Sequence, residues 1–586
     1  MNKRYVLLGF VAQYYWFTFL LKSESYYAPY LFVGILGIVC AVSNLKGKVE
    51  VLEKREKILA IIGSVMFSVI VIIANYSLFL NLPCPDGAGA AFIKIYKVLS
   101  CLLVFAGGCF IAWNILNFGC FKLKDFSWKK EKHTLSPKCF FILSLVLLSS
   151  LNLAWLFLAK YPGNISPDSL NQMRQIITGK WNNHHPFYHT MLIKIFISVG
   201  LNLFGEINAA VSLYHVFQIV FMAASFSYVL VTLYQMNVSG KLICLCGIYY
   251  IASPFHIMYS FTMWKDIIFG GTVCLFITAI YRIQKSIGKV IFLNYLLAVL
   301  GSIGICLFRS NGWFSYLLTV LFFIWMFRKR YKSLCAAFIG VLIITFILKH
   351  PVLEALHVTP PHAIESLAIP AQQIARTVTD CDDLSEKQRR VLNEVIDVDA
   401  IPTTYQPHIS DPIKRLVRER GNYESFSKHK GELLKLYAEL AFAHPFKYIE
   451  AWIDSTVGYW NGGYAVDRWV DGVGTNGVSN LGIVRTVKWN FADKLLNGYL
   501  WLFENVEVLK LFLSIGFHVW IIMFLGFIDL IRKDKQAGFM IVPVATIILS
   551  LMVATPLFAT LRYVYAMFCI IPFLILGTFY KGESAG

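Results

Sequence analysis

The sequence is short of charged residues, and acidic residues are the scarcer kind. Asp, Glu, Lys and Arg together make up 15% of its 586 residues, against about 25% in soluble globular domains. Hydrophobic residues make up 57% and aromatic residues 16%. This balance argues against an ordinary soluble protein and is typical of a polytopic membrane protein.

Several chemical motifs are also missing. Neither a Walker A pattern nor a strand-borne GxGxxG loop occurs, so we expect no ATP hydrolysis and no nucleotide-sugar binding by those motifs. There is no CxxC pair, and most of the thirteen cysteines fall in or beside apolar segments, which argues against a disulfide framework or a cysteine zinc site. Cys84 and Cys381 lie in regions expected outside the membrane and could pair. No cleavable signal peptide and no internal repeat is recognisable.

Positive charge is concentrated in short loops between apolar segments, and the formal net charge is +19. The basic loops are residues 46–57, 122–138, 282–289, 328–332 and 532–535. If Lys3 and Arg4 are inside, alternation of the spans places all five loops inside, as the positive-inside rule requires. We therefore expect a multi-pass membrane protein with a cytoplasmic N-terminus, and no nucleic-acid partner.

Fourteen apolar segments approach the roughly 20 residues that cross a bilayer. They lie near residues 4–21, 28–43, 58–80, 95–117, 139–160, 209–235, 241–259, 264–281, 290–307, 312–327, 333–349, 508–530, 538–555 and 560–579. The sequence thus predicts an all-α polytopic membrane protein with about fourteen transmembrane helices. The predicted parts are an N-terminal four-span addition (1–138), a catalytic transmembrane core (139–349), a mainly helical extracytoplasmic domain (350–507) and a C-terminal three-span segment (508–586).

Residues 161–205 form a polar-rich interruption that does not resemble a cytoplasmic loop. Ser166 is suited to cap a helix, Pro167 to occupy its first position and Gly179 to end it. A second helix is predicted to start near Pro186, with Phe187, Met191, Leu192, Ile195, Phe196 and Val199 on its apolar side and Thr190, Lys194 and Ser198 in a polar line. We expect both helices to be amphipathic and to lie in the membrane interface.

The predicted topology brings the unusual polar residues to the extracytoplasmic face. Asp168 opens the first helix of residues 161–205 and is a candidate general base, although an acid in a first helical turn is also favoured by the helix dipole alone. Lys265 and Asp266 lie at a span boundary, where Asp266 could orient an acceptor or hold a metal, or the two could simply neutralise each other.

Arginines form a further group of candidates. Arg309, followed by Asn311, interrupts an apolar stretch and could hold a phosphate through two parallel hydrogen bonds, or could be a snorkelling side chain at a helix end. Arg562 is a second candidate for phosphate binding.

Histidines and aromatics complete the candidate residues. His185 and His189 are four apart on a predicted helix, beside His184, but no third ligand is identifiable. We therefore predict no metal site there and place His185 among the substrate-binding residues. Trp460, with Tyr464 and Trp469, could stack on a sugar face or rest at the membrane interface.

The order of these elements resembles the GT-C glycosyltransferases, protein O-mannosyltransferases and lipid A aminoarabinose transferases in particular. The resemblance covers roughly residues 140–330. It rests on Asp168, Gly179, His185-Pro186, Leu203-Phe204-Gly205, the stretch SPFHIMYSFTMWKD that ends at Asp266, and LFRSNG around Arg309. The chain departs from those families where His-His-Pro replaces a basic-Pro-Pro element and where four extra spans precede the core. It also resembles an uncharacterised family of large bacterial membrane proteins that share YPG…DS, HHP, KD and RxNG.

The resemblance implies a membrane glycosyltransferase that moves a sugar from a polyprenyl-phosphate carrier to an extracytoplasmic cell-envelope glycan or lipid. Asp168 would be the base, Asp266 the orienting acid and Arg309 the phosphate-binding group. No cofactor is predicted, although a divalent cation is possible. The main alternative is a transporter or flippase of lipid-linked saccharides, since buried charges also mark transport pathways; a polysaccharide polymerase or ligase is a third interpretation.

Overall fold

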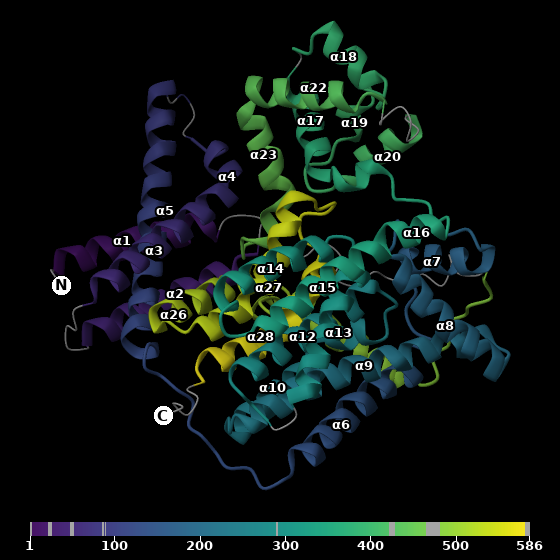
Figure 1. Cartoon of the computed structure of the whole chain (residues 1–586). Coiled ribbons are helices and arrows are strands. Elements are labelled where there is room, and N and C mark those ends of the chain that lie inside the picture. Colours follow the sequence, from purple (N-terminus) through teal and green to yellow (C-terminus); the bar gives the residue numbers. More distant parts are fainter. Residues whose placement is uncertain are drawn as a thin grey trace. The chain divides into compact units, whose positions relative to one another are not determined.

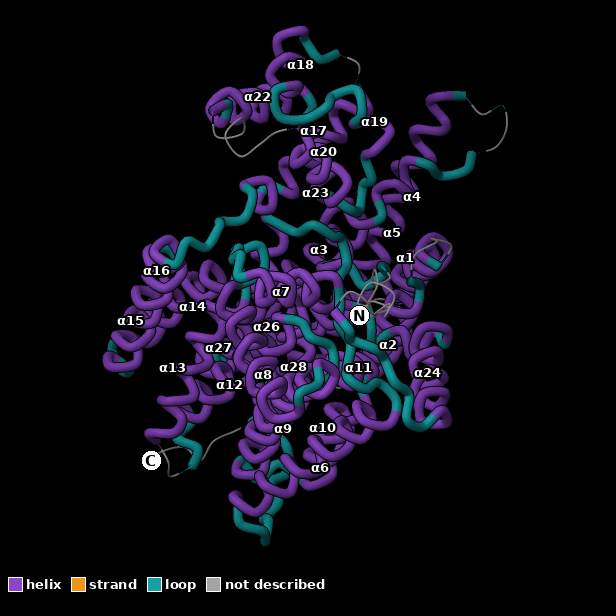
Figure 2. The backbone as a smooth tube through the Cα atoms, turned by 90° about the vertical axis from the view of Figure 1, so that its right-hand side faces the viewer, coloured by secondary structure: helices purple, strands orange, loops and turns teal. Residues whose placement is uncertain are grey.

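The computed structural model describes residues 3–21, 26–46, 52–84, 87, 89–288, 291–381, 383–420, 428–464 and 481–580. Within these residues every named element is a helix, and β pairing is confined to isolated bridges such as Asn164 with Thr262. Figure 2 accordingly shows purple helices and teal loops without an orange strand in the described part of the chain. The predicted all-α class is confirmed.

The chain folds into two compact units, and the first comprises residues 1–127, 456–467 and 505–535. Its helices are α1 (Lys3–Leu20), α2 (Ala28–Lys46), α3 (Lys54–Ala74), α4 (Tyr76–Leu80), α5 (Ala90–Phe118) with the π-turn η1 (Gly119–Leu123), η3 (Val457–Tyr459), α25 (Glu507–Lys510) and α26 (Ile515–Arg532). Trp16, Tyr30 and Trp520 centre its apolar core. The Tyr30 hydroxyl accepts hydrogen bonds from the side-chain amides of Asn75 and Asn461, so this buried hydroxyl has two polar partners inside the core.

The second unit contains residues 128–455, 468–504 and 536–586. Its apolar helices are α6 (Pro137–Leu158), α8 (Phe187–Phe204), α9 (Ile207–Gln235), α10 (Gly240–Ala252), α11 (Pro254–Ser260), α12 (Lys265–Gln284), α13 (Ile291–Phe308), α14 (Gly312–Phe327), α15 (Lys332–Lys349), α27 (Lys535–Val553), η6 (Leu561–Val564) and α28 (Tyr565–Thr578). The amphipathic α7 (Pro167–Thr178) and α24 (Asn490–Asn505) accompany them; α7 is labelled in Figure 1 and α24 in Figure 2. Helix α12 is central, because it packs against α9, α13 and α28 and is buried along almost its whole length.

Ten described helices are long and apolar enough to cross a membrane, or eleven if the bent pair α10–α11 is one span. Three further apolar helices, Ala28–Asn44, Phe292–Phe308 and Gly312–Phe327, are shorter. The chain is therefore a helical protein with multiple candidate spans, and the predicted number of fourteen is not confirmed. Helix α8 is among the ten, so its predicted position in the membrane interface stays a prediction.

A group of shorter helices follows α15 and belongs to the second unit (Figure 1). They are α16 (Pro351–Ala355), η2 (Ala363–Ser366), α17 (Ala368–Asp380), α18 (Glu386–Asn393), α19 (Ile401–Thr404), α20 (Asp411–Arg420), α22 (Lys430–Ala443) and α23 (Pro445–Thr456). Ile364, Ala375, Leu392, Ile401, Ile413, Leu436 and Tyr448 are members of their shared apolar core. We call this group the helical domain. The division into four predicted segments stays a prediction. Residues 456–467, which fall in the predicted extracytoplasmic domain (350–507), cluster with the first unit.

Candidate functional site

Helix α7 presents Asp168 in its first turn, and both helix ends follow from local sequence. The Ser166 hydroxyl accepts a hydrogen bond from the backbone N–H of Ser169, Pro167 is the first helical residue, and Gly179 ends the helix with φ 67°. Proline suits a position whose N–H would have no partner, and glycine adopts the left-handed conformation at low cost. The predicted start and end of this helix are confirmed.

The chain before α7 pairs with the turn that precedes α12. The backbone N–H of Asn164 donates to the Phe261 carbonyl at 2.7 Å, and that of Met263 donates to the Asn164 carbonyl at 2.9 Å. From α9, the buried Gln218 amide donates to the carbonyls of Tyr259, Ser260 and Thr262. These bonds fix the first turns of α7 and α12 beside each other, and with them Asp168 and Lys265.

Trp264 ties this turn to the helix cap. Its indole N–H donates to Ser166 Oγ at 2.6 Å, so the capping hydroxyl serves both helices. On the other side, the Arg562 guanidinium lies 4.8 Å from the centre of the Trp264 ring, a cation–π contact. A single aromatic side chain therefore lies between the start of α7 and the arginine that precedes α28.

Two cations neutralise the Asp168 carboxylate. Arg562 Nη1 lies 2.9 Å and Lys265 Nζ 3.7 Å from Asp168 Oδ2. The Asp168 side chain is 29% exposed, whereas those of Arg562 and Lys265 are 14% and 17% exposed. The Asp168 side chain is thus the most exposed of the three.

The pKa of Asp168 reflects two opposing effects. Burial raises the pKa of this carboxyl, but the charges of Lys265 and Arg562 outweigh burial and hold it well below its ordinary value. Lys265 Nζ also lies 3.2 Å from His185 Nδ1. Burial and the Lys265 charge lower the pKa of His185, so this imidazole is neutral at pH 7 and its Nδ1 accepts a hydrogen bond from the Lys265 ammonium.

A second ion pair lies deeper. Asp266 Oδ1 is 3.1 Å from Arg309 Nη1, and the two side chains are 1% and 8% exposed. Arg309 also donates to the Tyr563 carbonyl and lies 4.9 Å from the centre of the Tyr563 ring. Because a buried ion pair costs desolvation on both sides, its geometry has to be held by the surrounding fold. Both polar contacts use Arg309 Nη1, and the role of Arg309 as the phosphate-binding group stays a prediction.

The other predicted residues have separate surroundings. The Asn311 amide donates to Ser550 Oγ at 2.6 Å. Trp460 belongs to the first unit, where its indole N–H donates to Thr456 Oγ1, and its role in substrate binding stays a prediction. Trp469 lies outside the described residues. Cys84 and Cys381 are both free thiols, so the suggested disulfide between them is not present.

His189 is not a metal ligand in this arrangement. Its Nε2 lies 2.9 Å from the Tyr214 hydroxyl, and its Nδ1 is within hydrogen-bond distance of the Gln172 amide. With both ring nitrogens engaged and the ring fully buried, it is a packed histidine of α8. The buried face of α8 consists of Phe187, His189, Thr190, Ile193, Ile197 and Gly200. Ile195 and Val199, on its predicted apolar side, are exposed on the protein, whereas Thr190, from the predicted polar line, is buried. The contact of this apolar side with the membrane interface stays a prediction.

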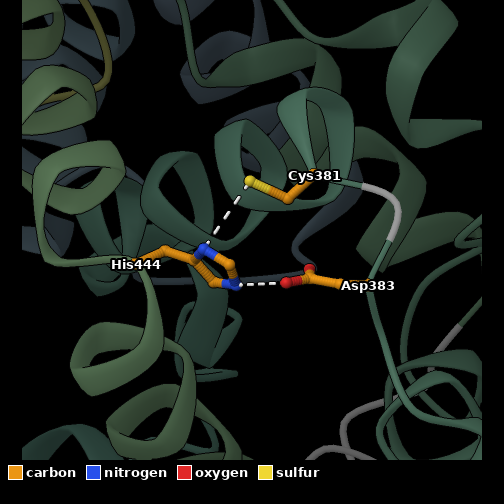
Figure 3. A group of neighbouring side chains, drawn as sticks. All are labelled: Cys381, Asp383 and His444. Carbon is orange, nitrogen blue, oxygen red and sulfur yellow. Dashed lines mark hydrogen bonds and ion pairs between the residues drawn. The ribbon is translucent and has the colours of Figure 1, made fainter.

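One group of three possible metal ligands occurs among the described residues, and it lies in the helical domain away from the sequence-predicted site. Figure 3 shows His444 between Cys381 and Asp383. His444 Nδ1 lies 3.7 Å from Cys381 Sγ, and its Nε2 lies 3.1 Å from an Asp383 oxygen. The two contacts use opposite nitrogens of one ring, and burial raises the pKa of the Cys381 thiol. The arrangement therefore favours a protonated, hydrogen-bonded thiol over a metal centre.

The helical domain is attached to the loops around the site. The Asn183 N–H donates to the Thr359 carbonyl and the Thr359 N–H donates to the Trp181 carbonyl. The N–H of Ser410 donates to the Pro556 carbonyl and that of Phe558 to the His408 carbonyl. The first pair of bonds joins the loop after α7, and the second joins the loop that leads to Arg562.

Sequence reasoning did not name two members of the site, Trp264 and Tyr563. Arg562, the second candidate for phosphate binding, lies nearer to Asp168 than Lys265 does. Trp264 and Tyr563 flank the arginines, and each is adjacent in sequence to a charged site residue. The sequence signal that could have identified Trp264 and Tyr563 is an aromatic residue next to a charged residue at a span boundary.

The fold and this group of side chains define a helical, polytopic membrane protein. Its paired-charge site, at the ends of apolar helices, consists of Asp168 with Lys265 and Arg562, and of Asp266 with Arg309. The chain belongs to a family of unknown function, DUF6020, whose match covers residues 178–586. Lys265, Asp266, Arg309 and Arg562 lie within the matched region, and Asp168 lies ten residues before it. No curated protein and no solved structure matches the chain.

Proposed function

We propose that the protein is a GT-C-type glycosyltransferase that moves a sugar from a polyprenyl-phosphate carrier to a cell-envelope glycan or lipid. One observation carries the proposal: a partly exposed carboxylate, Asp168, is held between Arg562 and Lys265 at the ends of apolar helices. A lipid-phosphate donor needs cations for its phosphate and a base for the acceptor, and this group supplies both within about 4 Å.

Arg562 and Lys265 are the proposed phosphate-binding groups. Arg309 pairs with the buried Asp266, whereas Arg562 and Lys265 share a partner, Asp168, whose side chain is partly exposed. A guanidinium and an ammonium together offset the charge of the donor phosphodiester and stabilise the second negative charge that develops on the phosphate monoester as it leaves. The Asp266–Arg309 pair then positions the start of α12, and with it Lys265.

The transfer step balances around Asp168. The acceptor hydroxyl oxygen forms a bond to the anomeric carbon, its proton moves to Asp168 Oδ, and the carbon–oxygen bond to phosphate breaks with its electron pair on the phosphate. Before the donor binds, the two cations make Asp168 a weak base. A bound phosphate shares those cations, so the pKa of Asp168 rises in the complex and the carboxylate becomes a better proton acceptor.

The proposed location is a bacterial plasma membrane, with the N-terminus in the cytoplasm and the Asp168 site on the extracytoplasmic face. The distribution of basic loops supports this orientation. A divalent cation is not needed in the proposal, because Arg562 and Lys265 already offset the Asp168 charge and Arg309 offsets that of Asp266. We expect transfer to continue in the presence of a chelator.

The experiment uses purified protein in lipid vesicles with a panel of polyprenyl-phosphate sugars, each labelled in the sugar, and an extract of cell-envelope acceptors. Label that moves from lipid to acceptor supports the proposal. Label that stays on the lipid but crosses the bilayer contradicts it and favours the transporter or flippase. Heat-denatured protein in the same vesicles is the control for spontaneous exchange.

A further inference from the structure

A large apolar groove runs along α12 within the second unit, between α6, α8, α9 and α13. Its volume is about 840 Å³, and its lining is almost entirely apolar, with Leu192, Phe217, Phe221, Ile268, Leu275 and Leu300 among its walls. The lining residues of α12 extend from Ile268 to Arg282, about 21 Å along a helix that rises 1.5 Å per residue. That length is a large part of the roughly 30 Å hydrocarbon core of a bilayer.

The two ends of the groove differ chemically. At one end, Phe308 and Ile268 lie within two residues of Arg309 and Asp266 in sequence, so this end approaches the paired-charge site. At the other end the lining becomes polar, with Arg282, Asn294, Gln235 and Lys138. The groove therefore joins a deep apolar wall to a basic end on the side opposite the Asp168 site.

Arg282 is the unusual member of this basic end. It is 7% exposed, its Nε donates to Asn294 Oδ1 at 3.0 Å, and its Nη1 donates to Thr232 Oγ1 at 2.9 Å. Its guanidinium also lies 5.2 Å from the centre of the Tyr228 ring. All of these partners are neutral, and no carboxylate pairs with Arg282 among the residues that the structure describes.

Other shielded arginines of this unit do have acidic partners. Arg309 pairs with Asp266, Arg562 with Asp168, and Arg376 with Asp380, Glu450 and Asp454. A buried charge without a counter-ion is costly. Basic pockets between membrane helices on the cytoplasmic side commonly bind anionic lipid headgroups, and the predicted topology places the Arg282 end on that side.

We propose that this groove binds one anionic glycerophospholipid, with its phosphate against Arg282 and Lys138 and one acyl chain along the apolar wall. The charge of the headgroup supplies the counter-ion that Arg282 lacks, and the chain covers the exposed lining residues of α13, Leu293 and Leu300. Lys138, at the start of α6, is exposed and can approach the phosphate from the open side. This site is separate from the proposed transfer reaction and does not depend on it.

The test measures lipid that stays with the purified full-length protein. Vesicles of phosphatidylcholine with one-fifth phosphatidylglycerol are used for reconstitution, the protein is re-extracted and washed in detergent, and retained lipids are quantified by mass spectrometry. We expect about one phosphatidylglycerol per chain and little phosphatidylcholine. Equal retention of both lipids per amount supplied would overturn the proposal, as would displacement of phosphatidylglycerol by inorganic phosphate alone.

Variants separate the headgroup from the groove. Arg282→Gln removes the charge and is expected to lower phosphatidylglycerol retention about tenfold or more, the scale of one lost hydrogen bond to a charged group. Ala224→Phe fills the apolar wall while leaving Arg282 in place, and is expected to lower retention as well. Arg328→Gln changes an exposed arginine on another basic loop and should retain the lipid. Wild-type retention by both Arg282→Gln and Ala224→Phe would contradict the proposal.

Discussion

At the residue scale, the Asp168 carboxylate is defined by its two cations more than by its helix. An acid in a first helical turn gains a modest stabilisation from the helix dipole, whereas Arg562 contributes a hydrogen bond at 2.9 Å and Lys265 a second charge. The Asp266–Arg309 pair has the same composition, but it is buried and closed to reactants. Because the two pairs differ in exposure, we propose reaction at Asp168 and a positioning role for the Asp266–Arg309 pair.

Replacement of Arg562 tests the proposed phosphate-binding role. In Arg562→Met, we expect the half-saturating concentration of the lipid-phosphate donor to rise about 10- to 100-fold, since a hydrogen bond to a charged group contributes roughly 1.5–3 kcal/mol. Initial rates against donor concentration measure this change. Arg389→Met, which removes an arginine from an exposed pair with Asp399, is the matched control. An unchanged half-saturating concentration in Arg562→Met would remove Arg562 from the phosphate site.

His185 gives the site a pH-dependent stability. Burial and Lys265 lower its pKa in the folded protein, whereas in the unfolded chain it titrates near 6.5. Below pH 6.5 the unfolded state therefore binds the additional proton, and stability falls by up to about 1.4 kcal/mol per pH unit for this group. Asp168 does not add to the change in this window, because its folded-state pKa is lowered and its contribution is lost only below about pH 4.

The matching measurement is the midpoint of thermal unfolding between pH 7.5 and 4.5. In His185→Gln, we expect the unfolding midpoint to fall less steeply as the pH decreases, by the contribution of one titrating group. His357→Gln, at an exposed position, is expected to keep the wild-type slope. If the two variants follow the same curve as the wild type, His185 is not held neutral by the fold.

At the element scale, α7 shows what sequence alone can predict. Its cap, first residue and last residue follow from Ser166, Pro167 and Gly179, because helix ends depend on neighbouring residues. The partner of its acid does not, since Arg562 is far away in the chain and is brought close by α28. The exposed apolar side chains of α8, such as Ile195, agree with its predicted apolar side. An apolar side chain next to a bilayer can be exposed without a cost, which removes the usual link between apolar residues and the protein core.

The cap of α7 is expected to matter for activity as well as for stability. Ser166→Ala removes the acceptor for the Ser169 N–H and for the Trp264 indole, so we expect a loss of about 1 kcal/mol and a lower transfer rate as Asp168 loses its position. Ser136→Ala removes the equivalent cap of α6. It should cost similar stability with no loss of rate once the protein is folded. Equal rate losses in both variants would mean that the α7 cap has no particular role in the site.

At the scale of the whole molecule, composition was sufficient for the class and insufficient for the number of spans. Long apolar runs predicted a helical membrane protein, and the described helices agree. The described parts of α13 and α14 are shorter than the helices counted as candidate spans. Compact units also join distant parts of the chain, as residues 505–535 do with the N-terminal helices, and such long-range packing is not encoded in local patterns.

The predicted orientation can be tested by thiol labelling in intact cells. In a background that carries Cys139→Ser and Cys244→Ser, which removes the exposed native thiols, we expect an impermeant maleimide to label Asp399→Cys in the helical domain and not Lys329→Cys in a basic loop. Both positions are exposed. Labelling of both after permeabilisation is the control. The reverse pattern would place the helical domain in the cytoplasm and contradict an extracytoplasmic site.

The most direct test of the central claim is single-turnover transfer by Asp168→Asn. Wild-type protein and the variant are each given a labelled polyprenyl-phosphate sugar and acceptor, with Asp399→Asn as a surface control and thermal unfolding as a check of folding. We predict that Asp168→Asn folds and binds donor but transfers about 10²- to 10⁴-fold more slowly, the usual contribution of a general base. Transfer by Asp168→Asn at the wild-type rate would contradict the account.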